Sequence, residues 1–178
     1  QKGPRLLAEQ GFAAADTQLT YAIGGLALWS ADSQGVDALG KVLTGGDFTR
    51  LAIANPQIAP YGVAAVQLLE RLGLYDQVAT RLVLGANIAQ TYQFVSTGNA
   101  GIGLVARSQV LLKSAESSAK NGSFWMVPDQ FYEPIRQDAI TLNRALKNSA
   151  AIEFMAFINT SQARAMIAAF GYRLSEPG

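Results

Sequence analysis

Short apolar runs alternate with stretches of helical spacing along most of the chain. Apolar runs at 19–29, 50–55, 82–84 and 101–106 predict strands, and helical patterns at 60–72, 88–95 and 109–118 follow three of them. Strands that alternate with helices are typical of βαβ units and a largely parallel sheet. The pattern therefore predicts an α/β fold.

The remaining elements are shorter. Strands are expected at 124–128 and 139–143, and helices at 5–11, 36–43, 150–159 and 161–170. Ser161 is the expected N-cap of the last helix because its hydroxyl can accept a first-turn N–H. Residues 119–122 are expected to form a loop and residues 175–178 a disordered tail.

The stretch from 50 to 65 is the most informative. An apolar run ends at Asn55-Pro56, and a helical pattern opens at Pro60 with Tyr61 and Gly62. The buried face of this helix is expected to carry Val63, Val66, Leu69 and Leu72. Tyr61 stands out because an aromatic side chain at a helix start is not expected in the core.

A second helix start follows the strand at 82–84, with Asn87 as a plausible N-cap before Ile88. Both starts should open at the carboxyl edge of the sheet, where free amide groups can hold a small anion. The loop between Asn55 and Pro60 contains no basic residue, so neutral donors would have to hold the anion. The alternative is an ordinary strand–loop–helix without a ligand.

Composition narrows the function. The chain has 178 residues, 49% of them hydrophobic, which is enough for one or two small domains. Its 14 basic and 13 acidic residues argue against a nucleic-acid partner. It has no His and no Cys, and its carboxylates are scattered. A thiol or histidine enzyme, a metal site and a cofactor are therefore not expected.

Two points in the sequence are typical of crossings between lobes. They are Gly24-Gly25, inside an apolar run, and Glu133-Pro134. The expected organisation is a remnant of a first lobe at 1–23, a complete α/β second lobe at 24–134, and a return to the first lobe at 135–178. The first lobe would be too thin to form a complete layer.

Several motifs resemble the periplasmic molybdate-binding proteins of ABC importers. They are Leu51-Ala52-Ile53-Ala54-Asn55-Pro56, Ala59-Pro60-Tyr61-Gly62, Leu82-Val83-Leu84-Gly85-Ala86-Asn87-Ile88-Ala89-Gln90 and Ser161-Gln162-Ala163-Arg164. The resemblance implies an α/β, type II periplasmic-binding-protein fold, here with one complete lobe built on a mostly parallel sheet and one incomplete lobe. It also implies a substrate-binding component, not an enzyme.

The resemblance implies that the fold closes on molybdate or tungstate, held by neutral hydroxyl and backbone N–H donors. Tyr61 and Ile88 match ligand positions, and Gly62 and Asn87 complete the expected site. Where some members place a tyrosine ligand, this chain has Ala106. The implied partner is the membrane permease of an ABC importer, and the implied location is the periplasm.

The resemblance covers almost the whole chain but not the first strands and helices of the family, which supply Ser/Thr ligands. The expectation is therefore a truncated member with impaired oxyanion binding. An alternative is an interaction or assembly module that pairs through the exposed edge of its truncated lobe, with self-association and no ligand. A hydrolase or transferase on this fold is a third, disfavoured alternative.

Overall fold

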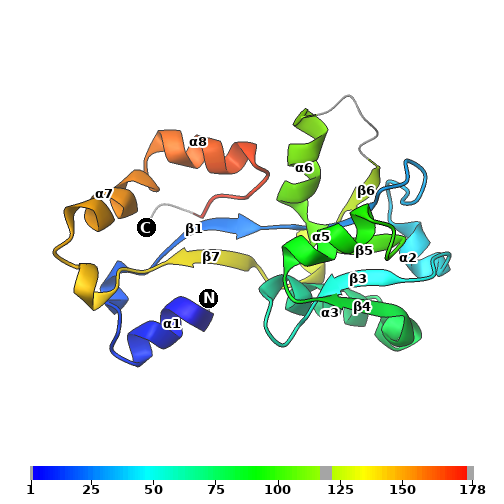
Figure 1. Ribbon diagram of the computed structural model, residues 1–178, viewed down its shortest axis with the longest axis horizontal. Coiled ribbons are helices and arrows are strands. Elements are labelled where there is room, and N and C mark those ends of the chain that lie inside the picture. The colour runs from blue at the N-terminus through cyan, green and yellow to red at the C-terminus, as the bar shows by residue number, and fades with distance from the viewer. Residues whose placement is uncertain (1, 117–121, 176–178) are drawn as a thin grey trace. The chain divides into compact units, whose positions relative to one another are not determined.

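A computed structural model describes residues 2–116 and 122–175, which form two compact units (Figure 1). Unit 1 combines Gln1–Gly24 with Arg136–Gly178, and unit 2 is Gly25–Ile135. Most of the predicted loop at 119–122 and of the predicted tail at 175–178 lies outside the described residues. Among the described residues, no helix combines the length and apolar character needed to cross a bilayer.

Unit 2 is built on a five-stranded sheet of order β4-β3-β5-β2-β6. The strands are β2 (Leu26–Ser30), β3 (Leu51–Ala54), β4 (Leu82–Gly85), β5 (Ile102–Ala106) and β6 (Ser123–Met126). β3 runs parallel to β4 and β5, whereas β2 runs antiparallel to β5 and β6. The expected mostly parallel sheet is therefore wrong in part, because the sheet is mixed. β2 follows the crossing at Gly24–Gly25, so no βαβ connection sets its direction.

The helices of unit 2 connect these strands. They are α2 (Lys41–Gly45), α3 (Pro60–Arg71), α4 (Tyr75–Val78), α5 (Ile88–Ser96) and α6 (Arg107–Glu116), with 3-10 turns η2 (Ala79–Arg81) and η3 (Asp129–Phe131). The helix predicted at 36–43 is displaced to α2. It begins only after Gly40, whose φ of 67° places that residue in the left-handed region.

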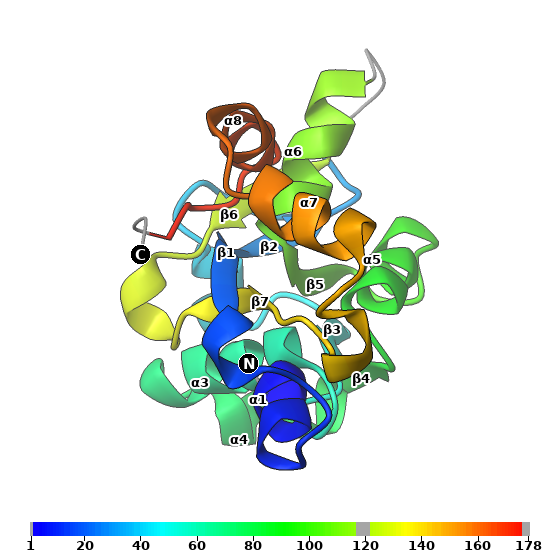
Figure 2. The same cartoon turned by 90° about the vertical axis from the view of Figure 1, so that its left-hand side faces the viewer.

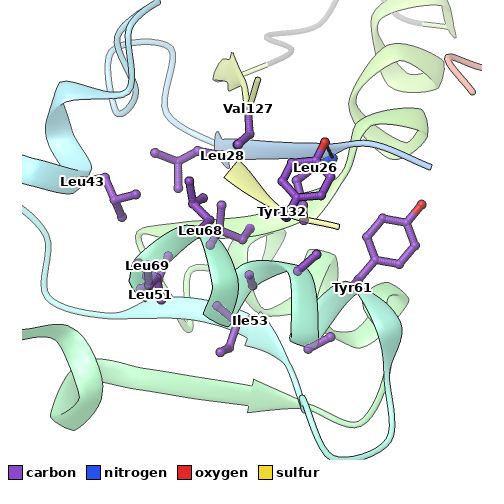
Figure 3. Packing of buried hydrophobic residues seen from close by; sticks show 14 of the residues in the cluster. Leu26, Leu28, Leu43, Leu51, Ile53, Tyr61, Leu68, Leu69, Val127 and Tyr132 are labelled. Atoms are coloured by element: carbon purple, nitrogen blue, oxygen red, sulfur yellow. Dashed lines mark hydrogen bonds between the residues drawn. The ribbon is translucent and has the colours of Figure 1, made fainter. Parts of the chain in front are cut away.

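The sheet of unit 2 carries a core on each face. On one face, Leu68 and Leu69 of α3 pack with Leu51 and Ile53 of β3 (Figure 3). On the other, Val95 of α5 belongs to a cluster with Ala52, Trp29 and Val105. Within that cluster the rings of Trp29 and Tyr92 stack, with centroids 4.4 Å apart. Every residue of β3 is buried, as expected for a strand with helices on both faces.

The buried face of α3 differs from the predicted one. Its buried residues are Tyr61, Gly62, Ala64, Ala65, Leu68 and Leu69. Val63, expected in the core, is 39% exposed. Small side chains at 64 and 65 let the helix lie close to the sheet, and spacing of large apolar residues does not capture that effect.

Unit 1 contains α1 (Lys2–Glu9), η1 (Ala15–Thr17), η4 (Asn143–Ala145), α7 (Ser149–Phe157) and α8 (Ser161–Ala169) around the two-stranded sheet of β1 (Leu19–Gly24) and β7 (Ile135–Ala139). In two views, α7 and α8 lie on one side of this pair and α1 on the other (Figure 1 and Figure 2). Among the described residues of unit 1, the buried apolar side chains are alanines: Ala13, Ala22 and Ala163.

Two predictions in unit 1 are wrong in detail. The strand expected at 139–143 lies at Ile135–Ala139 instead, where polar residues hide the apolar alternation. Its Asp138 accepts a hydrogen bond from the Thr20 hydroxyl of β1 at 2.7 Å, so a polar contact joins the two strands. The N-cap of α8 is Thr160 rather than Ser161, since the Thr160 hydroxyl accepts the Ala163 N–H.

Candidate anion-binding site

Asn55 shapes the loop between β3 and α3. Its side-chain oxygen accepts the N–H of Gln57 at 2.9 Å, and its carbonyl accepts the N–H groups of Ile58 and Ala59. Pro60 then occupies the first turn, where a missing N–H breaks no helical bond. The loop therefore delivers the first turn of α3 to the carboxyl end of β3.

Tyr61 is a core residue with one end outside the core. It is 9% exposed and belongs to the cluster between α3 and the sheet. The expectation that Tyr61 is not a core aromatic is therefore wrong. Figure 3 shows its ring at the margin of the cluster with the hydroxyl directed away from Leu68 and Ile53. An apolar ring and an outward hydroxyl are compatible with a donor held in a fixed position.

Gly62 brings the helix close to the strand. A Cβ at this position would lie 2.2 Å from the Ala54 carbonyl oxygen and 2.7 Å from the Pro56 nitrogen, so no larger residue fits without movement. The Gly62 N–H is donated to the Ala59 carbonyl at 2.9 Å. Gly62 thus positions the start of α3, and its amide is engaged within the loop.

The start of α5 has a reciprocal cap. The side-chain oxygen of Asn87 accepts the N–H of Gln90 at 2.9 Å, and the side-chain oxygen of Gln90 accepts the N–H of Ala86 at 2.6 Å. The predicted N-cap is confirmed, and this resembles a capping box. The Ile88 N–H, in the first turn, has no acceptor among the described residues.

The two helix starts share one edge of the sheet. β3 and β4 are parallel neighbours, and Ala54 pairs with Gly85 at their carboxyl ends. The N–H of Asn55 donates to the Gly85 carbonyl at 2.7 Å and links the two following loops. α3 and α5 cover opposite faces, so their first turns reach this edge from the two sides. The next strand along the chain, β4, lies on one side of β3, and the following strand, β5, lies on the other. A point where the strand order changes sides in this way is a typical place for a ligand site in an open α/β sheet.

A third helix, α6, starts at the same edge. It follows β5, the other parallel neighbour of β3, without a loop. Gln109 ties it to α5, because its side chain accepts the Ala106 N–H at 3.0 Å and donates to the Ile88 carbonyl at 3.3 Å. Ala106 itself is buried, at 3% exposure.

Arg107 begins α6, so a basic residue follows β5 at the same edge of the sheet. Its backbone N–H donates to the Gly25 carbonyl at 2.8 Å, and its Nε is buried without a hydrogen-bond partner in the described part of the chain. Its place at this edge follows from the pairing of β5 with β3, which local sequence patterns do not reveal. The signal that could have identified it is a basic residue directly after a buried strand.

The amino-acid sequence matches one known protein family over nearly its whole length. Residues 1–173 match the family of bacterial extracellular solute-binding proteins. The chain belongs to this family. The family is described as one of solute-binding proteins, in agreement with the prediction of a binding protein rather than an enzyme. Within the described residues, no group of three or more acidic, His or Cys side chains could hold a metal ion.

Two relatives and one solved structure are especially similar. The chain is 43% identical to the molybdate-binding protein ModA of Rhodobacter capsulatus and 46% identical to that of Azotobacter vinelandii, over 95% and 96% of its length. It spans 64% and 67% of those two proteins. The A. vinelandii periplasmic molybdate-binding protein superimposes with a TM-score of 0.90 at 40% identity, over 98% of this chain and 75% of that one. The predicted α/β periplasmic-binding-protein fold is confirmed.

Proposed function

We propose that this chain binds a tetrahedral oxyanion, molybdate or tungstate, as the periplasmic substrate-binding component of an ABC importer. The proposed partner is the membrane permease of that importer. The observation that supports this most is the 43–46% identity to two molybdate-binding proteins over 95–96% of the chain. The shared edge of the α3 and α5 starts supports it independently.

The four predicted residues have different parts in this proposal. The Tyr61 hydroxyl and the Ile88 N–H donate to the anion, Asn87 caps and orients α5, and Gly62 sets the position of α3. A hydrogen bond to a charged acceptor contributes about 1.5–3 kcal/mol, and helix dipoles favour an anion at both starts. These 178 residues span 64% and 67% of the two relatives, so by themselves we expect them to bind the anion more weakly than the A. vinelandii protein does.

The decisive experiment removes one amide hydrogen. Proline suits the first position of a helix, and Asn87 already has the extended backbone that precedes proline. Ile88→Pro should therefore keep α5 and abolish the response to molybdate. Ile88→Ala is the matched control, because it shortens the side chain and keeps the N–H. The measurement is the amide NMR shift of Ala89 and Gln90 during titration with molybdate, with sulfate in parallel.

The outcomes separate clearly. Weak binding that Ile88→Pro abolishes and Ile88→Ala preserves supports the proposal. An unchanged response in Ile88→Pro would remove Ile88 from the site, and no response to millimolar molybdate would refute oxyanion binding by this chain. A sub-micromolar Kd would contradict the expected weakness.

A second candidate function is an interaction module that self-associates through unit 1 and binds no ligand. The exposed apolar side chains of α7 and α8 favour it. It predicts a concentration-dependent increase in mass by sedimentation together with no molybdate response.

A further inference from the structure

Thr91 is a buried polar residue in the second turn of α5. Its side chain is fully buried. The hydroxyl donates to the Asn87 carbonyl at 3.0 Å, and the Thr91 backbone N–H donates to the same carbonyl at 3.1 Å. A buried hydroxyl is costly unless it has a partner, so this hydrogen bond fixes the side chain. The Asn87 carbonyl therefore accepts two hydrogen bonds from one residue.

The Asn87 carbonyl belongs to the same peptide group as the Ile88 N–H. A peptide group is planar and trans, so its C=O and its N–H point in opposite directions. The two hydrogen bonds that hold the Asn87 carbonyl therefore also fix the direction of the Ile88 N–H, which has no acceptor among the described residues. Hydrogen bonds to the carbonyl also polarise the peptide group and make its N–H a stronger donor.

The end of β4 holds Thr91 from the side of the sheet. A Cβ at Gly85 would lie 2.7 Å from the Thr91 hydroxyl oxygen and 3.1 Å from the Asn87 carbonyl oxygen. The strand can approach the hydroxyl this closely because residue 85 is a glycine. The Gly85 carbonyl also accepts the Asn55 N–H at 2.7 Å. The contact with Thr91 therefore ties the start of α5 to the loop that precedes α3.

Gln109 of α6 holds the next peptide group. Its side-chain amide donates to the Ile88 carbonyl at 3.3 Å. The peptide groups on both sides of the Ile88 Cα are thus held through their carbonyls, one by Thr91 and the other by Gln109. An amide that is already oriented loses less conformational freedom when it binds a ligand, so less affinity is lost to ordering.

We infer that Thr91 is a positioning residue for oxyanion binding, whose hydroxyl orients and polarises the Asn87–Ile88 peptide group so that the Ile88 N–H is ready to donate to the anion. Because Thr91 is fully buried, it acts through Ile88 and does not touch the ligand. The inference rests on the proposed function and adds a residue to it. The alternative is a hydroxyl that only satisfies itself within its own helix, as threonine can do in any helix.

The other end of α5 offers a matched control. Thr97 donates its hydroxyl and its N–H to the Gln93 carbonyl at 2.8 Å and 3.0 Å, so it repeats the arrangement of Thr91 away from the first turn. Thr91→Val and Thr97→Val each replace one hydroxyl with a methyl group of similar size. Thr91→Ser keeps the hydroxyl and removes the methyl group instead.

The measurement is a titration of each variant with molybdate, followed by amide NMR shifts. Thr91→Val should raise the Kd by about threefold to tenfold, the effect of losing one neutral hydrogen bond. Thr97→Val should leave the Kd unchanged, and Thr91→Ser should restore most of the affinity. Without molybdate, the carbonyl-carbon shift of Asn87 and the amide-nitrogen shift of Ile88 should change in Thr91→Val and not in Thr97→Val. Urea unfolding measures the stability of the three variants separately.

Three results would overturn the inference. They are an unchanged Kd in Thr91→Val, an equal increase in Thr91→Val and Thr97→Val, and a Thr91→Ser variant that binds as weakly as Thr91→Val. Each is measured on a chain that binds molybdate, so each leaves the proposed function standing. A chain without substitutions that does not respond to molybdate refutes the proposed function, and the role of Thr91 with it.

Discussion

Unit 2 buries large side chains on both faces of its sheet, whereas the buried apolar residues described in unit 1 are alanines. Both units contain apolar helices. In unit 2 these helices cover a five-stranded sheet, and in the described part of unit 1 α7 and α8 accompany a two-stranded sheet. The contrast shows that apolar composition predicts a core only where enough sheet is present to receive it.

The largest expected difference between the units is the response to truncation of a leucine. Leu68 is fully buried between α3 and the sheet, and Leu146 of unit 1 is 43% exposed. Leu68→Ala should lower the free energy of unfolding by about 2–5 kcal/mol. Leu146→Ala should change it by roughly 0.5 kcal/mol or less. Urea unfolding measures both, and equal losses would contradict the contrast.

A smaller effect is expected at the strand–helix junction of unit 2. Gly62→Ala places a methyl group against the Ala54 carbonyl and should cost about 1–3 kcal/mol by forcing backbone shifts. Gly101→Ala is the control, because a Cβ there meets nothing within 4 Å. Thermal unfolding compares them. If the two variants unfold at the same temperature, the close approach of α3 to β3 is not required for stability.

The loss of a helix cap should have the next smaller effect, and each unit has one asparagine that caps a helix. Asn87→Ala should destabilise by about 0.5–2 kcal/mol and weaken molybdate binding, since the cap orients the Ile88 N–H. In unit 1, Asn148 caps α7 by accepting the Ala150 and Ala151 N–H groups. Asn148→Ala should leave binding unchanged. Equal binding losses would mean that Asn87 acts only through general stability.

The smallest effect concerns tyrosine titration. Burial raises the pKa of Tyr21 in unit 1, and Tyr172 and Asp138 raise it further. Burial alone raises the pKa of Tyr92 in unit 2. Because the folded pKa lies above the ordinary value of 10.0, each tyrosine stabilises the fold below that pH and loses its contribution as pH rises through the folded pKa. Asp138→Asn should lower the pKa of Tyr21 and leave the pKa of Tyr92 unchanged. Absorbance at alkaline pH measures both, and a shift in Tyr92 would contradict this assignment.

Local signals predicted the elements that carry the candidate site. Pro60 in the first turn of α3 and Asn87 at the N-cap of α5 act within a few residues, so the sequence reveals them. The shared edge of the two starts also followed from the alternation of strands and helices. The roles of Tyr61, Gly62, Asn87 and Ile88 in binding remain predictions.

What the sequence did not reveal depends on distant contacts. The direction of β2 depends on the crossing before it, and the burial of Tyr61 depends on how closely α3 approaches the sheet. Arg107 joins the same edge only because β5 pairs with β3. The strand β7 was predicted at the wrong residues because its polar Asp138 breaks the apolar pattern. Within the sheet, that carboxylate is satisfied by the hydroxyl of Thr20 on the neighbouring strand.

The stacked rings of Trp29 and Tyr92 have a practical consequence. Tyr92 belongs to α5, the helix whose first turn carries Ile88, and Trp29 belongs to the central sheet. A movement of α5 by a fraction of a ring diameter would change the surroundings of the indole and hence its emission. Trp29 is therefore an intrinsic fluorescent reporter of the position of α5, the helix whose first turn belongs to the candidate site. Titrations with molybdate need no added label.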